Sequence, residues 1–332
     1  MKNRDFVIYE SLIERATSAE IRDSQKQKTL SNLSKVEKDE FQQKLEECRR
    51  KKVEIVTYLD NSYPEILRQI PDYPTVLYCC GNINLLREKH FVAMVGSRRA
   101  TDYGLLVAKK FSAKIAGAGA VIVSGMALGI DGMCHRGALS VNGKTIAVLG
   151  TAIDNLYPKE NEALGKKIVE SGGCVVSEYP PGYWTNKFNF PMRNRIIAGL
   201  SSATVVIEAA ENSGALITAG LTLDYNRNLY AVPSDIGKLS GQGTNRLLLQ
   251  GAICLISPQV IIEDLGLSGA VQNIKLTVQE AKIIEVIRSG CDNFDKITNK
   301  LKIKSNELNV LLAGLEIRGL IKKSADKIQT FD

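Results

Sequence analysis

FVAMVGSRRATDYG, residues 91–104, and AVIVSGMALGID, residues 120–131, decide the fold of this chain. In each stretch a short apolar run with β-branched residues ends in a glycine-bearing turn, and a segment of helical length follows. Runs of this kind are typical of strands that are buried on both faces of a parallel sheet. The two stretches therefore predict neighbouring strand–turn–helix units.

The same alternation continues through the middle of the chain and predicts a doubly wound, mostly parallel α/β sheet. Apolar runs of strand length occur at 91–95, 121–123, 145–149, 174–176, 204–207, 229–232 and 253–256. Segments of helical length lie between them at 103–118, 131–141, 161–171, 193–200, 215–226 and 245–250. This order implies right-handed βαβ crossovers, and the ligands of such sheets bind at the carboxyl ends of the strands.

Shifts in composition divide the chain into three expected parts. Residues 1–75 are polar, with helical spacing and a proline-punctuated end, so we expect a small helical region and a lead-in. Residues 76–266 carry the sheet. The sequence of residues 274–332 predicts three helices and two short strands, which is the order of elements in a winged helix. Such a domain could read DNA or dock onto a protein, and the sequence favours neither role. The basic run 49–52 has two possible interpretations, a nucleic-acid-binding patch or the charged end of a helix.

The composition excludes several classes of protein. The 332 residues, 44% hydrophobic and 24% charged, are typical of a globular chain. No apolar stretch approaches the roughly 20 residues of a membrane span, and no secretory signal is visible, so we expect a cytoplasmic protein without a membrane span. The seven cysteines form no CxxC pair and there are only two histidines, so we expect neither a disulfide framework nor a metal site.

The net charge of +7 permits a polyanionic partner but does not locate one. Basic side chains outnumber acidic ones by one in residues 1–60 and by three in each of residues 61–270 and 271–332. Because this excess is spread along the chain, the position of individual arginines and lysines must identify any binding surface.

Three strand-to-helix turns have the composition of anion-binding sites. Glycine permits close approach of a ligand, and helix N-termini attract negative charge. None of the turns is a GxGxxG or Walker loop, so nicotinamide dinucleotide binding and P-loop phosphoryl transfer lose their usual support, and we expect no cofactor. Each is also compatible with an ordinary strand-to-helix turn. The expected phosphate-binding residues are Gly96, Ser97, Ser124, Gly125, Gly129, Ser213, Gly214 and Thr218.

Two titratable residues follow the second turn. Asp131 stands at the start of a helix, where an aspartate is more often a cap than a catalytic acid. His135 lies one turn later beside Cys134 and has no evident carboxylate partner. We therefore predict a structural role for both.

A proline-held loop after the fourth strand interleaves cations with aromatic rings. Such a pattern suits single-stranded nucleic acid, because cations meet phosphates while rings stack on bases. The alternative is that a ring in this loop anchors it as an ordinary hydrophobe. The residues concerned are Trp184, Lys187, Phe188, Phe190, Arg193 and Arg195.

Several motifs, in order along nearly two thirds of the chain, resemble the DNA-processing protein A family, also called DprA or Smf. Long motifs in register are far more specific than any single turn. They are VGSRRATDYG at 95–104, SGMALGIDGMCHRGAL at 124–139, IAVLGTAIDNLYPKEN at 146–161, SEYPPG at 177–182, FPMRNRIIAGLS at 190–201 and SGALITAG at 213–220.

The resemblance implies a Rossmann-like homodimer that binds single-stranded DNA, protects incoming DNA during natural transformation and loads the RecA recombinase, without catalysis. Carried over by motif, the DNA contacts would be Arg98, Lys159, Lys187 and Phe190, with Lys238 less well aligned. The C-terminal part also looks like a domain that many family members carry.

The chain departs from the family pattern where Ala152 and Ser234 stand in place of glycines. An alternative function is that of a nucleotide-binding or nucleotide-hydrolysing protein resembling the phosphoribohydrolases. Those enzymes use a PGGxGT turn followed by a catalytic glutamate, whereas here the helix after the turn at 212–215 contains no glutamate. A non-catalytic nucleotide sensor is the third possibility.

Overall fold

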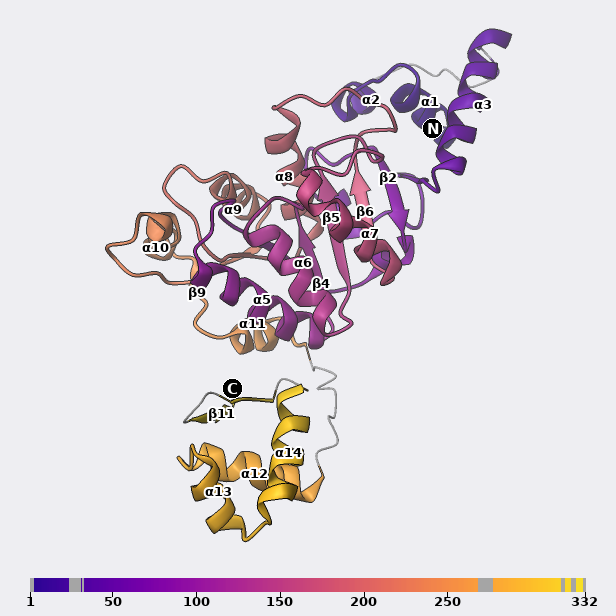
Figure 1. Ribbon diagram of the computed structural model, residues 1–332. Helices are drawn as coiled ribbons and strands as arrows, with labels where there is room; N and C mark the ends of the chain where they lie inside the picture. Colours follow the sequence, from indigo (N-terminus) through magenta and orange to yellow (C-terminus); the bar gives the residue numbers. More distant parts are fainter. Residues whose placement is uncertain are drawn as a thin grey trace. The chain divides into compact units, whose positions relative to one another are not determined.

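The computed structural model describes residues 3–23, 31, 33–267, 277–317, 320–323 and 327–330 (Figure 1). The chain divides into two compact units, residues 1–270 and 271–332. Among the described residues, no helix combines the length and the apolar character that crossing a bilayer requires.

The larger unit is built on a nine-stranded sheet with the order β1-β2-β6-β5-β4-β3-β7-β8-β9. The seven strands β6-β5-β4-β3-β7-β8-β9 are parallel to their neighbours. β2 pairs antiparallel with β6, and β1 pairs antiparallel with β2, which gives the sheet an antiparallel edge. The strands are β1 (Glu54–Thr57), β2 (Val76–Gly81), β3 (Phe91–Val95), β4 (Val121–Ser124), β5 (Thr145–Leu149), β6 (Cys174–Ser177), β7 (Ala203–Val206), β8 (Asn228–Ala231) and β9 (Ile253–Cys254).

The strand order reverses beside β3. The chain runs outward from β3 through β4 and β5 to β6, and then returns to place β7 on the other side of β3. In doubly wound sheets the crevice outside the carboxyl ends of the strands at such a reversal is the usual ligand site. The doubly wound, mostly parallel sheet expected from the sequence is confirmed.

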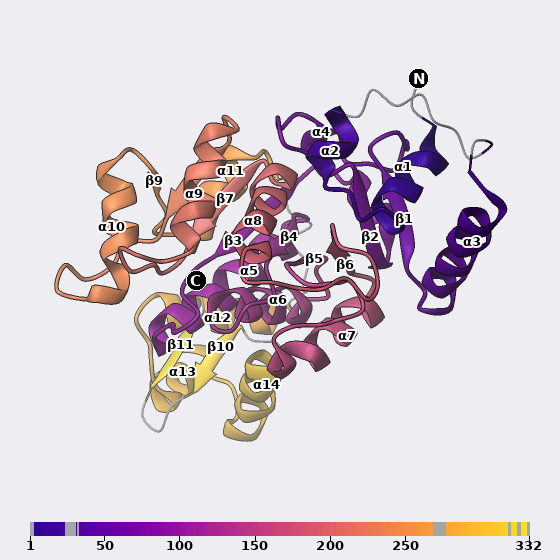
Figure 2. The ribbon, with the colours of Figure 1, turned by 90° about the horizontal axis from the view of Figure 1, so that it is seen from above.

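Helices cover both faces of the sheet (Figures 1 and 2). Val92 and Met94 of β3 share one buried cluster with the helices that follow β3 and β4, whereas Ala93 and Val95 share another with the helices on either side of β7. Every residue of β3 is buried as a result. The helices of the sheet are α5 (Asp102–Gly117), α6 (Ile130–Ser140), α7 (Glu162–Glu170), α8 (Asn189–Leu200), α9 (Ala215–Asp224), α10 (Gln242–Leu249) and α11 (Pro258–Asp264).

The N-terminal helices pack on the edge of this sheet. Phe6 and Tyr9 from α1 and Phe41 from α3 share a buried cluster with Tyr78 of β2 and Val175 of β6. The expected region 1–75 is therefore part of the same compact unit as the sheet, because β1 pairs with β2. The helices before β3 are α1 (Arg4–Leu12), α2 (Ser18–Asp23), α3 (Lys35–Arg50) and α4 (Glu65–Arg68), and the short 3-10 turns of the unit are η2 (Ile83–Arg87), η3 (Lys159–Asn161) and η4 (Leu239–Gly241).

In its described residues, the smaller unit contains three helices followed by a two-stranded antiparallel sheet. Ile283, Ile297 and Leu312, one from each helix, and Ile321 from the first strand share its buried cluster. The order of elements is the one expected from the sequence, and the winged-helix assignment stays a prediction. The elements are α12 (Val278–Arg288), α13 (Phe294–Leu301), α14 (Ser305–Ile317), β10 (Ile321–Lys323) and β11 (Ile328–Thr330).

Two expectations about the helices of the sheet were wrong. Helix α8 begins at Asn189, four residues before the expected start, so Phe190 and Pro191 belong to its first turn. A proline is compatible with the first turn of a helix, since the N–H it lacks has no partner there. Helix α11 was not expected, and it packs Ile261 into the cluster beneath α5.

Candidate functional site

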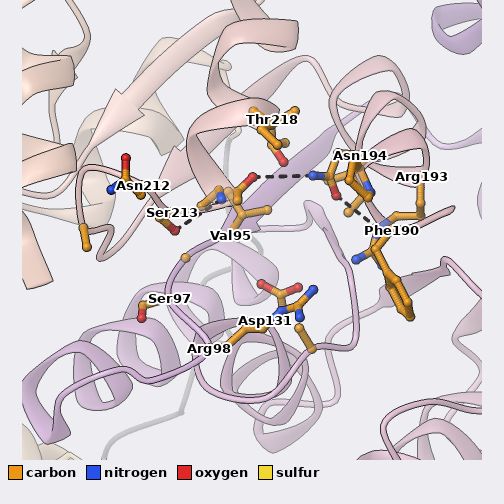
Figure 3. Close-up of a pocket in the computed structure, with 18 of the residues that line it drawn as sticks. Val95, Ser97, Arg98, Asp131, Phe190, Arg193, Asn194, Asn212, Ser213 and Thr218 are labelled. Carbon is orange, nitrogen blue, oxygen red and sulfur yellow. Dashed lines mark hydrogen bonds between the residues drawn. The ribbon is translucent and has the colours of Figure 1, made fainter. Parts of the chain in front are cut away.

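A pocket of about 530 Å³ lies at the reversal of the strand order (Figure 3). We call it the switch pocket. One wall comes from the turn after β3 and the other from the turn after β7, and the first two turns of α8 contribute between them. Of the expected site residues, the switch pocket is lined by Gly96, Ser97, Arg98, Phe190, Arg193, Ser213, Gly214 and Thr218.

The turn between β3 and α5 is held by a buried glutamate that sequence reasoning did not single out. The carboxylate of Glu208, at the end of β7, accepts hydrogen bonds from the backbone N–H of Thr101 (3.1 Å) and from its hydroxyl (2.6 Å). The backbone carbonyl of Glu208 accepts from Ser97 N–H at 2.7 Å. Thr101 in turn caps α5 by accepting from Gly104 N–H. The turn that carries Arg98 is therefore fixed at both ends.

Arg98 projects from this turn toward the ring of Phe190. The guanidinium carbon lies 5.8 Å from the ring centroid, within the range of a cation–π contact. On the same ring, Tyr157 makes a tilted aromatic contact with a centroid separation of 5.6 Å. A Cβ on Gly150 would come within 2.9 Å of the Phe190 ring, so the glycine lets the ring lie against the end of β5. Tyr157 was not anticipated, although it stands in the LYPKEN stretch.

Four cations belong to the segments that carry Arg98, Tyr157 and Phe190. Arg98, Arg99, Lys159 and Lys187 are exposed, and no carboxylate in the described part of the chain pairs with any of them. Arg99 lines the switch pocket but was not predicted, because the sequence does not show which of two adjacent arginines faces inward. Lys159 is the first residue of η3, and Lys187 precedes α8. Neither lysine is among the residues that line the pocket.

The opposite wall presents small and polar groups. Ser213 and Gly214 form the turn before α9, and the hydroxyl of Ser213 accepts from Ala215 N–H at 3.3 Å. Asn194 of α8 donates to the Gly214 carbonyl at 3.5 Å, which joins the two helices across the pocket (Figure 3). The first N–H groups of α9 bond within this turn, Leu216 to the Ser213 carbonyl and Ile217 to the Gly214 carbonyl, so what the helix N-terminus offers an anion is mainly its partial positive charge.

Two buried charged side chains, Arg193 and Asp131, line the switch pocket and influence each other electrostatically. The Arg193 guanidinium donates to the carbonyls of Gly125, at 2.6 Å, and Val148. Burial lowers the pKa of Arg193 to about 10, with Asp131 acting in the opposite direction. Burial raises the pKa of Asp131, and the positive charge of Arg193 opposes that shift. Arg193 remains protonated near neutral pH, but its donors are largely used by the protein.

Asp131 does not cap α6. The N-cap is Gly129, and the Asp131 carboxylate accepts from Gly125 N–H at 3.2 Å, which fixes the turn after β4. The interpretation of Asp131 as an N-cap was therefore wrong, and its role in shaping this turn is structural. His135 is fully buried, and its ring hydrogen-bonds only to Thr145 among the described residues, through Nδ1 at 2.7 Å.

Other expected residues are placed away from the switch pocket. Ser124 is buried and donates to the Met94 carbonyl at 2.6 Å, so it joins two strands. Gly125 and Gly129 are packed against protein atoms, since a Cβ would lie 2.6 Å from the Arg193 guanidinium and 2.3 Å from the Ser97 carbonyl oxygen respectively. These three residues shape the site without lining it.

Arg195 is corrected from a DNA-binding candidate to a structural residue. Its side chain is buried and ion-paired with Glu178 at 2.5 Å and with Asp72 at 3.7 Å. Ser18 of α2 also donates to Glu178, at 2.5 Å, so this network ties the N-terminal helices to the loop after β6. A phosphate has no access to a guanidinium held in this way.

The fold and the switch pocket define a class of protein. It is a Rossmann-like α/β protein with a pocket where the strand order reverses, and its sequence lacks the fingerprint of a dinucleotide or P-loop site. Residues 54–266 match the family model of DNA recombination-mediator protein A, and the chain belongs to that family.

Two relatives of similar sequence are named protein Smf. The chain is 40% identical over 225 residues to protein Smf of Synechocystis and 41% identical over 203 residues to protein Smf of Escherichia coli. These matches cover 67% and 61% of this chain but only 56% and 54% of the relatives, so the chain spans little more than half of their length.

Two solved structures share the fold. The X-ray structure of DNA processing protein A from Streptococcus pneumoniae has a TM-score of 0.65 and 34% identity, covering 79% of this chain and 98% of that one. The structure of DNA processing protein A from Helicobacter pylori has a TM-score of 0.58 and 32% identity, covering 64% and 95%. The latter was described for its unique mode of single-stranded DNA binding.

Proposed function

We propose that the chain binds single-stranded DNA at the switch pocket and acts as a recombination mediator without catalysis. The observation that carries the proposal is the Arg98 guanidinium held over the Phe190 ring at the rim of the pocket. A phosphate needs a cation, and a base needs a ring on which to stack. The corner where β3, α8 and α9 meet offers Arg98 as the cation and the half-buried Phe190 as the ring, beside the positive end of the α9 dipole.

Single strands fit this chemistry better than duplexes. Bases of a duplex are stacked on one another, whereas those of a single strand are free to stack on aromatic rings while cations track the backbone. Arg98, Arg99, Lys159 and Lys187 supply the cations. Phe190 and Tyr157, which is 51% exposed, supply rings.

A non-catalytic role is supported by what the nearby carboxylates do. Asp131 lines the switch pocket, but its carboxylate accepts a hydrogen bond from Gly125 N–H. Glu208 is buried and accepts from Thr101, and it is not among the residues that line the pocket. Both groups are engaged in holding turns, which leaves the alternative of nucleotide hydrolysis without a carboxylate dedicated to it among the described lining residues.

The biological role follows from family membership. The family is described as a recombination mediator, and on that basis we propose that the chain protects incoming DNA during natural transformation, delivers it to the RecA recombinase and works as a homodimer. Sedimentation of the purified protein tests the dimer, and RecA filament formation on protein-coated single strands tests the delivery.

Fluorescence anisotropy tests the binding proposal. A labelled oligo-dT and a duplex of equal length are titrated with the full chain at low salt. We expect clear preference for the single strand and an affinity that rises from one nucleotide to about ten. Equal affinity for a mononucleotide and a decamer would favour the nucleotide sensor, and undetectable binding would refute the proposal. Release of free base from a nucleoside monophosphate would identify a hydrolase.

A further inference from the structure

Large aromatic side chains are exposed on residues 182–188, the later part of the connection between β6 and α8, which leads directly into the helix that carries Phe190. We call residues 182–188 the aromatic loop. Trp184, the chain's single tryptophan, is 80% exposed, and Phe188 is 68% exposed. Isolated exposed hydrophobes are common, but two large rings gathered on one short loop indicate a binding surface.

These two rings do not anchor the loop, because other residues do. The Tyr183 ring stacks on Tyr179 with centroids 4.7 Å apart, and Gly182 N–H donates to Asp154 at 3.1 Å. At the other end, the side-chain oxygen of Asn186 accepts from Phe188 N–H at 2.8 Å. The start of the loop is thus held by Gly182 and Tyr183, a local turn shapes its end, and the rings of Trp184 and Phe188 stay exposed.

A cation lies between the two rings along the chain. The ammonium of Lys187 lies 5.4 Å from the centroid of the Phe188 ring, and no carboxylate of the described residues pairs with it. Phe190 of the switch pocket follows two residues later, and Trp184 is at most about 20 Å from it along the extended chain. The alternation of ring and cation therefore continues from the pocket into the loop.

From this arrangement we propose that Trp184 and Phe188 stack on further bases of the same single strand that occupies the switch pocket, with Lys187 binding the phosphate between them. The inference rests on the proposed function and extends it to a second contact region outside the pocket. The charge of Lys187 and the continuity with Phe190 favour a nucleic-acid strand over an apolar protein surface.

The single tryptophan makes a direct test possible in the full chain. The emission of Trp184 is recorded while oligo-dT of ~5 and of ~20 nucleotides is added, lengths chosen to fill the pocket alone or to extend beyond it. We expect the longer strand to quench the emission and the shorter one to change it little. Unchanged emission on saturation with the longer strand would overturn the inference.

Variants provide a second readout. Trp184→Ala should weaken binding of the longer strand by about 5- to 150-fold, the range that loss of one stacked base gives, and leave the shorter one unaffected. Trp184→Phe should restore much of the affinity, and Leu249→Ala, which removes a 90% exposed side chain from α10, should have no effect. Far-ultraviolet circular dichroism checks that each variant is folded.

The outcomes separate the two proposals. If the wild type binds both strands and Trp184→Ala and Phe188→Ala bind them equally well, the second contact region is refuted while the switch pocket stands. If the wild type binds neither strand, the proposed function itself fails, and this inference fails with it. Binding of a protein but of no strand by the aromatic loop would also overturn the inference.

Discussion

The guanidinium carbon of Arg98 lies 5.8 Å from the centroid of the Phe190 ring. The two residues are far apart in the sequence. Arg98 lies in the turn after β3, and Phe190 lies in the first turn of α8. Their contact places a cation and a ring at one edge of the switch pocket, opposite the N-terminal turn of α9 (Figure 3).

Removing single cations should weaken binding in a salt-dependent way. If Arg98, Arg99, Lys159 and Lys187 each neutralise one phosphate, the slope of log K against log salt concentration for oligo-dT is about −3. Arg98→Ala and Lys187→Ala should each move this slope toward zero by about 0.7 and lower the affinity about tenfold at low salt. Anisotropy across a salt series measures both quantities.

Lys166→Ala is the matched control for those variants. Lys166 lies on α7, pairs with Glu162 at 2.7 Å and does not line the switch pocket. Its loss removes one positive charge and should leave the slope unchanged. If the slope moves toward zero by the same amount in all three variants, the DNA is attracted by the overall charge of the protein and not by a defined site.

Glu208→Ala should lower both stability and affinity. The change leaves the Thr101 N–H and hydroxyl without their acceptor and should lower the free energy of unfolding by about 1–3 kcal/mol. The freed turn should also weaken DNA binding by displacing Arg98. In an Arg98→Ala background the second substitution should cost no further affinity, and a double-mutant cycle by anisotropy checks this. Additive losses would show that Glu208 acts by another route.

Gly129→Ala should be strongly destabilising. Gly129 has φ +76° and ψ −125°, and an added Cβ would lie 2.3 Å from the Ser97 carbonyl oxygen. We expect a loss of at least about 2 kcal/mol, measured by denaturant unfolding. Gly220→Ala in α9 is the control, because a Cβ there meets no atom within 4 Å and should stabilise the helix by up to about 1 kcal/mol. Similar unfolding midpoints for the two variants would contradict the close packing of the turns.

Because of His135, the free energy of unfolding should decrease as the pH is lowered. Thr145 donates its hydroxyl hydrogen to Ile122, so it accepts from Nδ1 of His135, and no described residue partners Nε2. Burial lowers the pKa of His135 to about 3, with Arg136 contributing further. Below about pH 6.5 the unfolded chain therefore takes up a proton that the folded protein does not bind, down to the folded pKa.

The resulting loss approaches about 1.4 kcal/mol per pH unit, or about 2 kcal/mol between pH 7 and pH 5, and is absent above pH 7. His135→Gln lacks the titrating group and should show a correspondingly shallower slope. Urea unfolding at the two pH values measures the difference for each protein. Equal slopes in wild type and variant would show that His135 does not titrate in this way.

The parallel core could be predicted because its signals are local. Strand β3 and strand β5 have the bounds that the apolar runs predict, since a strand buried on both faces leaves a continuous apolar run in the sequence. The antiparallel edge was harder to anticipate. Strand β2 lies in a stretch broken by prolines, and only its pairing with β6 makes it part of the sheet.

The site was predictable in its turns and less so in its side chains. Arg98 and Phe190, both named from motifs at a strand or helix end, line the switch pocket, and their contact with DNA stays a prediction. Arg193 and Arg195 stand two residues apart, yet one holds main-chain carbonyls and the other an ion pair with Glu178. No local pattern distinguishes a free arginine from a paired one, since the partner lies far away in the sequence. The same reason hid Glu208, whose partner Thr101 is 107 residues away.

The most direct test of the account is a crystal structure of the full chain with oligo-dT. The account predicts a phosphate between Arg98 and the turn of Ser213 and Gly214, with a base stacked on Phe190. A strand bound elsewhere on the molecule, with the switch pocket empty and Arg98 still resting on Phe190, would contradict it.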